Sequence, residues 1–430
     1  MEVQDFDRRT LLKGGGAAVA GLSVLKVAGP AHAFPGHPGE EEVLEWLDQP
    51  PTSPDQLVWE ELDSWFTPAD DFFIVNHYDQ PDIKAPDWRL AIGGLVKWPR
   101  TLTLDDLKGR PRREVDFTLE CSGNTGLPFF HGGIGNARWA GAQLAPILRH
   151  AGVLDEGIEV VFWGADSGEH IIRDNVGVLD PDGDSDGDPD NNDNGPAGRE
   201  KSGRFLPDQD FSLNSVDLKV TERFARSMTL EDALNPANLL CYEMNGVPLP
   251  PEHGFPVRLI APGWYGVANV KWLTRIEVWD QQYRVNFMAR DYVTIREQER
   301  DGEVVWTFAN VRHDRLKSAP AKVTRRDGRY RIMGAAWGAP IDRVEVRVDD
   351  GAWMKARLEF RPSRGRQARK YAWRFWTLRW DDATPGEHRI TSRAIDEDGN
   401  VQPAPDDDFL ASKVTFWESN GQITRRVLIP

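Results

Sequence analysis

Cysteine is scarce in this chain of 430 residues, which contains only Cys121 and Cys241. The scarcity excludes a disulfide-stapled fold, and a chain of this length can bury an ordinary core in two or three domains without such links. It also excludes an iron–sulfur cluster held by four cysteines, and no Cys-x-x-Cys-His motif for haem attachment occurs. A redox group of either kind would have to be carried by a separate protein.

Basic residues are also in short supply, because 52 Lys and Arg stand against 68 Asp and Glu, a formal net charge of −16. This balance argues against nucleic acid or an anionic membrane as a partner of the whole chain. Any anion site must therefore be built locally. Cys241 lies in the apolar run 239–242, which predicts a buried strand, so we expect no disulfide with Cys121.

The apolar run at 14–25 is too short to span a bilayer as a permanent helix. It follows the pair Arg8-Arg9 and precedes Ala31-His32-Ala33. This order predicts a twin-arginine signal peptide over residues 1–33 and export to the periplasm or another extracytoplasmic face. The alternative, a basic amphipathic helix, is disfavoured by three consecutive glycines at 14–16. Export of an already folded protein favours a complex cofactor.

Between residues 57 and 310, short apolar runs alternate with helix-like segments, a pattern typical of an α+β domain. Helices are predicted over 141–151 and 229–234, the second with Thr229 as its cap. Residues 34–56 are rich in Pro and Glu and predict an irregular N-terminal arm.

A polar insertion at 170–215 interrupts this domain and is dense in aspartate. Its alternating oxygen donors could hold Ca²⁺ weakly at Asp182, Asp184, Asp186 and Asp188. The bidentate Glu of a helix–loop–helix calcium site is missing from its required spacing. The alternative, a solvated loop without a bound ion, therefore stays open.

From about residue 311 the pattern changes to period-two alternation, which predicts an immunoglobulin-like β-sandwich over 311–430. Further strands are expected at 389–395 and 413–417. The residues that share a strand face are Val344, Val346 and Val348, and then Tyr371, Trp373 and Phe375. We expect this domain to serve packing and subunit contacts.

Cys121 follows an apolar, strand-like approach formed by Val115, Phe117 and Leu119, and it precedes a run of small residues at 122–126. Small residues leave the backbone open to a close approach. A thiol at such a strand end is a nucleophile, a ligand for a soft metal, or a buried structural group. The stretch alone leaves these three interpretations open.

Four other stretches of the chain supply polar side chains that are candidates for a binding site. The candidates are Asn76, His77, Asp166, His253, Arg258, Asn269 and Lys271. Any one of them alone is typical of a satisfied structural group. As a set, the two histidines, Arg258 and Lys271 can offer positive charge or donors to a phosphate, while Cys121 offers a thiolate.

The motifs around these residues resemble those of the sulfite oxidase family of molybdopterin enzymes, in its exported prokaryotic type. The resemblance covers the chain from about residue 57 to the end. The matching stretches are Cys121-Ser122-Gly123-Asn124, 137–141, 242–258 and 270–273, and in the C-terminal part 349–351, 372–374 and 400–403.

The resemblance implies a molybdenum–pyranopterin cofactor, with Cys121 as the catalytic residue and the protein ligand of the metal. Arg258 and Lys271 are expected near the pterin phosphate and the histidines near the ring system. The full set of implied cofactor contacts is Asn76, His77, Cys121, Ser122, Asp166, His253, Arg258, Asn269, Val270 and Lys271. The implied reaction is oxygen-atom transfer, with electrons passing to an external carrier such as a c-type cytochrome because no haem binds in this chain. The implied assembly is a homodimer formed through the C-terminal domain.

The chain departs from the family where substrate-binding arginines are expected. Val75, Thr125-Gly126 and Asn420 stand at those positions, and the active-site tyrosine has no clear counterpart. Three lost cations would remove most of a clamp for a dianion. The expected substrate is therefore sulfite or a related sulfur compound undergoing oxidation, or alternatively a neutral sulfoxide or other oxide undergoing reduction.

Two functions of other classes are also considered. The first is a metal-free cysteine hydrolase that uses Cys121 with His77 or His253 as base. The second is a calcium-dependent surface module built on the Asp-rich insertion and the sandwich.

Overall fold

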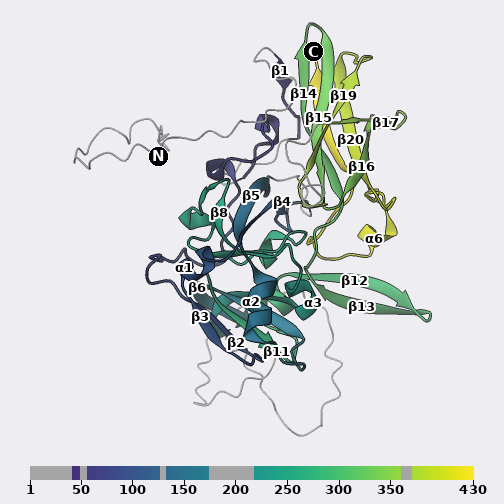
Figure 1. The fold of residues 1–430 in the computed structure, drawn as a ribbon. Helices are drawn as coiled ribbons and strands as arrows, with labels where there is room; N and C mark the ends of the chain where they lie inside the picture. Colours follow the sequence, from purple (N-terminus) through teal and green to yellow (C-terminus); the bar gives the residue numbers. More distant parts are fainter. Residues whose placement is uncertain (1–40, 49–55, 126–131, 174–216, 360–369) are drawn as a thin grey trace, which may run out of the picture. The chain divides into compact units, whose positions relative to one another are not determined.

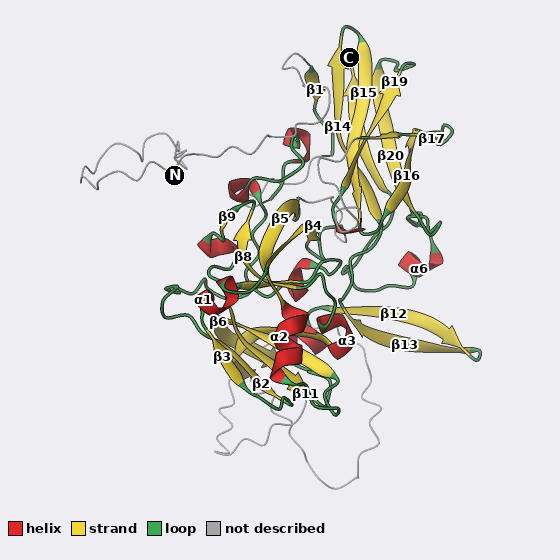
Figure 2. Cartoon of the chain, viewed as in Figure 1, coloured by secondary structure: helices red, strands yellow, loops and turns green. Residues whose placement is uncertain are grey.

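The computed structural model describes residues 41–48, 56–125, 132–173, 217–359 and 370–430. The described chain is rich in strands and its helices are short (Figure 1, Figure 2). The predicted signal peptide at 1–33 and the candidate calcium ligands Asp182, Asp184, Asp186 and Asp188 lie outside the described residues. Among the described residues, no helix combines the length and apolar character that a membrane crossing needs.

The first domain contains two five-stranded sheets. One has the order β3-β2-β11-β6-β7, and only the β11–β2 pair is parallel. Its strands are Arg100–Leu102, Leu90–Gly94, Leu273–Trp279, Glu159–Arg173 and Asp217–Thr229. The other is antiparallel, has the order β10-β8-β5-β4, and carries β9 beside β8. Its strands are Arg258–Ile260, Leu239–Met244, Ile134–Gln143, Arg112–Glu120 and, for β9, Val247–Pro248.

The helices are short and lie in the connections. They are α1 Leu104–Lys108, α2 Leu144–Ala151, α3 Leu230–Ala233, α4 Asn286–Ala289 and α6 Asp408–Ala411. Four 3₁₀ turns lie at Trp59–Glu61, Ala69–Asp71, Pro251–His253 and Gly266–Ala268. Helices α2 and α3 confirm the two that the sequence predicts, and the Thr229 hydroxyl accepts from the Asp232 backbone N–H as the expected cap.

The second domain is an antiparallel β-sandwich. One sheet has the order β1-β14-β15-β19-β18, with strands Glu42–Leu44, Lys317–Arg326, Arg329–Trp337, Arg374–Trp380 and Arg357–Leu358. The other has the order β17-β16-β20-β21, with strands Met354–Lys355, Ile341–Val348, Gly386–Asp396 and Ile423–Ile429. Between the two domains the chain forms a separate hairpin of β12 Val293–Arg300 and β13 Glu303–Asn310 (Figure 2). The α+β domain and the immunoglobulin-like sandwich that the sequence predicts are confirmed.

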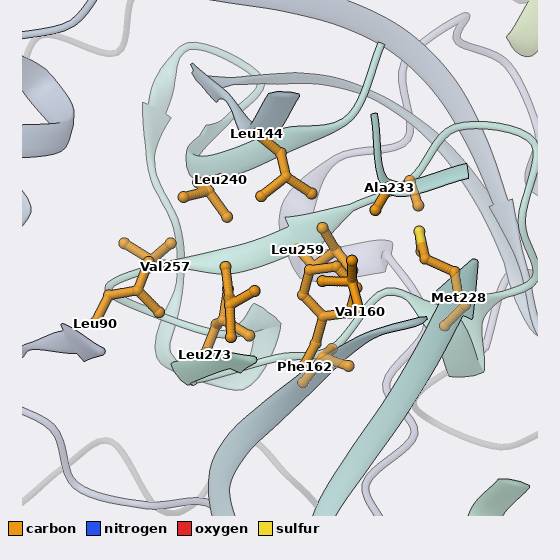
Figure 3. Close-up of a cluster of buried hydrophobic side chains, with 14 of the residues drawn as sticks. Leu90, Leu144, Val160, Phe162, Met228, Ala233, Leu240, Val257, Leu259 and Leu273 are labelled. Atoms are coloured by element: carbon orange, nitrogen blue, oxygen red, sulfur yellow. The ribbon is translucent and has the colours of Figure 1, made fainter. Parts of the chain in front are cut away.

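The largest core of the first domain lies between its two sheets, where α2 also contributes. Figure 3 shows Val160 and Phe162 of β6 beside Leu259 of β10, and Leu240 of β8 belongs to the same cluster. All four side chains are fully buried. This packing fixes the strand ends that carry the polar residues described below.

Three local expectations are wrong. The arm at 34–56 is not irregular throughout, because β1 pairs with β14 and Trp46 bridges to Val427. Residues 413–417 form no strand beyond a single bridge from Lys413 to Arg296, and the last strand is β21 instead. Tyr371 and Trp373 lie before β19 rather than in it, and Trp373 bonds to Thr118 and Trp65 instead. Each of these three segments makes contacts with residues that are distant in the sequence, and the local periodicity of the sequence does not record such contacts.

Candidate active site

Cys121 lies directly after β4, in a turn that the backbone holds on both sides. Its N–H donates to the Gly133 carbonyl at 2.8 Å, and its own carbonyl accepts from the Asn124 N–H at 3.0 Å. The Asn124 side chain closes the turn by accepting from the Gly133 N–H at 2.8 Å. A Cβ on Gly133 would lie 3.2 Å from the Cβ of Cys121, so the glycine lets the two segments approach.

Cys121 lines a cavity that is partly open to solvent. The cavity is lined by most of the polar residues that the sequence singles out, although they come from five separate stretches of the chain. Those that line it are Asn76, His77, Cys121, Asp166, His253, Arg258, Asn269 and Lys271. Ser122 and Val270 do not line it and are buried beside it.

Two cations lie at one part of this cavity without a carboxylate partner in hydrogen-bonding contact. Arg258 donates to the His253 carbonyl at 3.0 Å and to the Asn269 carbonyl at 2.9 Å, while its Nε is buried without a partner. Burial lowers the pKa of Arg258 to about 10. Lys271 donates to the Asn76 side chain and to the Glu252 carbonyl. Burial, and then the charge of Arg258, lower the pKa of Lys271 to about 7. An anion bound here would stabilise both charged forms.

Asp166 supplies the opposite charge to the same cavity. Burial raises the pKa of this carboxyl to about 6, and its Oδ1 is buried without a hydrogen-bond partner. A Cβ on Gly164 would lie 2.2 Å from Oδ1, so only glycine at 164 leaves room for the carboxyl in this position. Asp166 is therefore available to a ligand with hydrogen-bond donors.

The two histidines are neutral at physiological pH. Burial, followed by the charges of Lys271 and Arg226, lowers the pKa of His77 to about 4. Burial also lowers the pKa of His253. His253 Nε2 lies 3.0 Å from the Ala69 carbonyl, which can only accept, so Nε2 carries the proton and Nδ1 remains an acceptor.

Neither histidine serves Cys121 as a base. His77 Nε2 bonds to the Tyr292 hydroxyl at 2.7 Å and His253 to a carbonyl. Burial raises the pKa of the Cys121 thiol, and the charge of Glu120 raises it further. A hydrolytic cysteine needs a base within reach and a lowered pKa. The geometry therefore argues against the metal-free hydrolase.

Asn269 lines the cavity, but its amide is committed to the backbone. Its Oδ1 accepts from the Ala261 N–H at 2.7 Å, and its Nδ2 donates to the Tyr265 carbonyl at 3.0 Å. The side chain thus shapes the loop between β10 and Lys271. This is a structural contribution that the sequence does not distinguish from ligand binding.

Tyr292 is the cavity residue that the sequence analysis missed. It lies directly before β12, lines the cavity and packs against Trp417, with ring centroids 4.3 Å apart and the rings tilted by 34°. Burial, and next the proximity of Cys121, raises the pKa of its hydroxyl. The chain has only seven tyrosines, and this scarcity is the one signal that could have drawn attention to it.

The three positions where the family resemblance predicts arginines bring no charge to the site. Val75 lines the cavity and is 43% exposed. The Thr125 hydroxyl donates to the Ser419 carbonyl, and Asn420 is buried with its Oδ1 unpartnered. Gly126 lies outside the described residues.

The donor set fits a thiolate-bound metal attached to an anionic organic group. One cysteine lines the cavity, two cations there make no hydrogen bond to a carboxylate, and Arg258 Nε and Asp166 Oδ1 lack partners. A soft or high-valent metal would convert the high-pKa thiol to a thiolate.

Comparison with known proteins gives two family matches. Residues 77–178 and 207–287 match the oxidoreductase molybdopterin binding domain, and residues 305–415 match the Mo-co oxidoreductase dimerisation domain. The chain is 32% identical to mitochondrial sulfite oxidase of Homo sapiens over 375 residues, which cover 81% of this chain and 59% of that protein. It is 31% identical to the mitochondrial sulfite oxidase of Drosophila melanogaster over 79% of this chain and 56% of that protein. The chain thus spans somewhat over half the length of these curated relatives.

A solved structure shares the fold along nearly the whole chain. The sulfane dehydrogenase SoxCD from Paracoccus pantotrophus matches with a TM-score of 0.65 and 24% identity, covering 97% of this chain and 96% of that one. The family matches, the relatives and the shared fold agree with the cavity around Cys121. The chain belongs to the sulfite oxidase family of molybdopterin-dependent oxidoreductases.

Proposed function

We propose that this protein is a molybdenum–pyranopterin enzyme that oxidises sulfite or a related sulfur compound by oxygen-atom transfer. The observation that carries the proposal is the gathering of eight of the ten implied cofactor residues, Cys121 among them, around one cavity. When bound, the cofactor supplies a two-electron exchange of an oxygen atom between water and the substrate.

The chain's own residues bind and orient this group. Cys121 presents its sulfur to the metal, and the turn closed by Asn124 and Gly133 fixes the position of that sulfur. Arg258 and Lys271 would bind the phosphate, because neither makes a hydrogen bond to a carboxylate. Asp166 accepts from ring N–H groups.

A hydrogen bond of 2.7 Å joins His77 Nε2 and the Tyr292 hydroxyl. Because His77 stays neutral and Tyr292 keeps its proton, this pair offers hydrogen bonds without adding charge beside Cys121. Water is limited by the aromatic wall that Phe224 and Trp417 form around the pair. The pair therefore orients a bound substrate rather than exchanging net charge with it.

The direction of the reaction is proposed as oxidation, since the named relatives are a sulfite oxidase and a sulfane dehydrogenase. Reduction of a neutral sulfoxide is the second candidate, and the uncharged Val75 in the cavity wall favours it. Steady-state rates with sulfite and an electron acceptor, compared with methionine sulfoxide and a reduced dye, separate the two. A sulfoxide rate above the sulfite rate would reverse the proposed direction.

The proposed setting is extracytoplasmic, with electrons passed to a separate carrier such as a c-type cytochrome. The support is the Arg8-Arg9 signal pattern and the lack of haem and iron–sulfur motifs in the sequence. Replacing both arginines (Arg8→Lys with Arg9→Lys) is expected to retain the protein in the cytoplasm. Normal export of that variant would contradict the twin-arginine route.

A homodimer formed through residues 305–415 is proposed from the match to the dimerisation domain. Sedimentation of the purified protein tests this assembly, and a monomer at micromolar concentration would contradict it. Weak Ca²⁺ binding by the Asp-rich insertion stays a proposal that calorimetric titration with Ca²⁺ would test.

Metal analysis paired with Cys121→Ser tests the central proposal. Protein matured in a host with an intact pterin pathway is expected to contain about one molybdenum per chain. Cys121→Ser should remove one sulfur from the metal's shell in X-ray absorption and reduce turnover by at least about 10³-fold, since the thiolate ligand is lost. The matched control is Cys241→Ser, because Cys241 is buried in β8 and does not line the cavity. Mature protein without molybdenum, or an unchanged sulfur shell in Cys121→Ser, would refute the proposal.

A further inference from the structure

A second group of cations lies beside the turn that follows Cys121 and plays no part in the cofactor site. It consists of Arg296 on β12, Arg315 just before β14, and Lys413 just after α6 (Figure 1). Lys413 and Arg296 are bridge partners. The guanidinium carbons of Arg296 and Arg315 lie 3.6 and 5.1 Å from the centre of the same ring, that of Phe409. Three cations therefore converge on one small region.

One carboxylate faces these three cations. Glu418 lies 3.6 Å from Arg315, but its oxygens also accept from the Thr294 hydroxyl at 2.5 Å and from the Arg312 N–H at 3.4 Å. Lys413 donates to the Trp417 carbonyl at 2.6 Å and to the Ser419 hydroxyl, both of them neutral. The cluster therefore keeps an excess of about two positive charges in a partly desolvated place.

Arg296 gives the clearest sign of a missing ligand. The residue is only 8% exposed, and its Nη1 donates to the Phe409 carbonyl, but its Nη2 is buried without any partner. The Nε of Arg315 is also buried and unpartnered. A buried guanidinium N–H without an acceptor is costly, and an oxyanion satisfies such groups because their planar fork matches its oxygens.

The cluster is attached to the wall of the cavity. The Glu418 N–H donates to the Ser122 carbonyl at 2.9 Å, which ties the loop after Lys413 to the turn after Cys121. In the same loop Trp417 packs against Tyr292, which lines the cavity. Thr294 and Arg296 share one face of β12, and Tyr292 directly precedes that strand. A short run of residues thus joins the cations to the cavity.

We propose that Arg296, Arg315 and Lys413 form a binding site for a doubly charged sulfur oxyanion of the sulfite and sulfate class, behind the residues that line the Cys121 cavity and next to the turn that follows Cys121. This assignment rests on the function proposed above and specifies how the substrate is recognised. It accounts for the uncharged residues at Val75, Thr125 and Asn420, because the cations come from β12, the start of β14 and the loop after α6 instead. The cluster concentrates the anion next to the reacting centre.

The test is calorimetric titration of the purified full-length protein with sodium sulfate at constant low ionic strength. Arg315→Gln and Lys413→Gln are each expected to weaken sulfate binding about tenfold, the loss that corresponds to one charge-assisted hydrogen bond. Arg296→Gln should weaken it at least as much. The matched control is Arg300→Gln, an exposed arginine on the same strand, which should change the affinity less than twofold.

In the molybdenum-loaded enzyme, Arg315→Gln should raise the KM for sulfite by a similar factor while kcat stays within about twofold. Because Arg296 is buried, its variant is interpreted only if the protein remains folded, whereas Arg315 and Lys413 are partly exposed. Unchanged sulfate affinity in Arg315→Gln and Lys413→Gln, or an equal loss in Arg300→Gln, would overturn the inference. Molybdenum content measured on the same preparations separates the two proposals. If the molybdenum content is normal and the variants bind sulfate as the unchanged protein does, only the proposed sulfate site is refuted. If molybdenum is missing, the proposed function is refuted, while the sulfate titration still tests the site.

Discussion

Two groups of buried charged residues adjoin the end of β4 at Cys121. They differ in whether their polar atoms have hydrogen-bond partners. On the side of the sandwich, Glu120 and Lys317 are both 0% exposed and form an ion pair at 2.8 Å. The Glu120 carboxylate also accepts from Trp337 Nε1 at 2.9 Å and from Asn124 Nδ2 at 3.1 Å. On the cavity side, Arg258 Nε and Asp166 Oδ1 have no partner.

This difference distinguishes charged residues that stabilise the fold from charged residues that can bind a ligand. A buried ion pair with all its hydrogen bonds made is stable only while both partners remain. Buried groups left unpartnered lower the stability of the empty protein and are available to a ligand. We call the buried group of Glu120, Lys317 and Trp337 the joint, because it joins β4 to β14 and β15. Cys121 thus lies between this joint and a cavity whose charged groups are available to a ligand.

The largest expected effect comes from breaking the joint. Lys317→Met leaves Glu120 buried and uncompensated, so the free energy of unfolding should fall by about 3–5 kcal/mol. Urea denaturation of the cofactor-free protein measures this change. Lys355→Met, on the exposed strand β17, is the matched control and should change the stability by less than about 0.5 kcal/mol.

The double variant Lys317→Met with Glu120→Gln sharpens the comparison. Removing both charges should restore most of the lost stability, because no uncompensated charge remains. If the double variant is as unstable as Lys317→Met alone, shape rather than charge holds the joint together. The assignment of Glu120 as a structural carboxylate would then fail.

The second effect is a pH dependence on the cavity side. The pKa of Lys271 is lowered from 10.5 to about 7 in the folded protein. Between these values the unfolded chain binds the proton and the folded chain does not, so Lys271 makes stability rise with pH across this window. Lys271→Met should remove that rise, about 2 kcal/mol after allowance for solvent in the cavity.

Denaturation at pH 7 and pH 10 measures the difference between the protein and its variant, so that other titrating groups cancel. Lys108→Met, in the exposed last turn of α1, is the control and should leave the slope unchanged. A bound phosphate-bearing cofactor should suppress the slope, since its charge raises the pKa of Lys271. An equal slope in the protein and in Lys271→Met would show that the lysine stays charged in the empty cavity.

The same division explains what the sequence predicted well. The strand that leads to Cys121, the buried strand β8 and eight of the polar residues that line the cavity were predicted, because apolar alternation and short motifs record them locally. Motif spacing alone does not show whether a polar side chain makes its hydrogen bonds to the backbone. The Asn269 side chain bonds to the backbone, whereas Asp166 Oδ1 has no hydrogen-bond partner.

The residues that the sequence analysis missed depend on contacts between distant segments. Residues 413–417 alternate polar and apolar side chains as a strand would, but Trp417 packs on Tyr292 and Lys413 joins the cation cluster. Strand β1 is defined by pairing with β14, as in Leu44 opposite Val323. Tyr292 reaches Cys121 only because β12 brings it there. No local pattern encodes such partners.

The smallest expected effect tests whether the cavity wall itself is structural. Tyr292→Phe removes the hydrogen bond to His77 but keeps the ring packed against Trp417. Because cavity water can replace the lost partner, the free energy of unfolding should fall by only about 1 kcal/mol or less. Tyr330→Phe in the sandwich serves as the control for loss of a phenol hydroxyl. In the loaded enzyme, Tyr292→Phe should lower kcat more than Tyr330→Phe does, since only the former hydroxyl adjoins Cys121. A loss above about 2 kcal/mol would mean that the hydroxyl supports the fold as Glu120 does, and the contrast between the two sides of Cys121 would no longer hold at Tyr292.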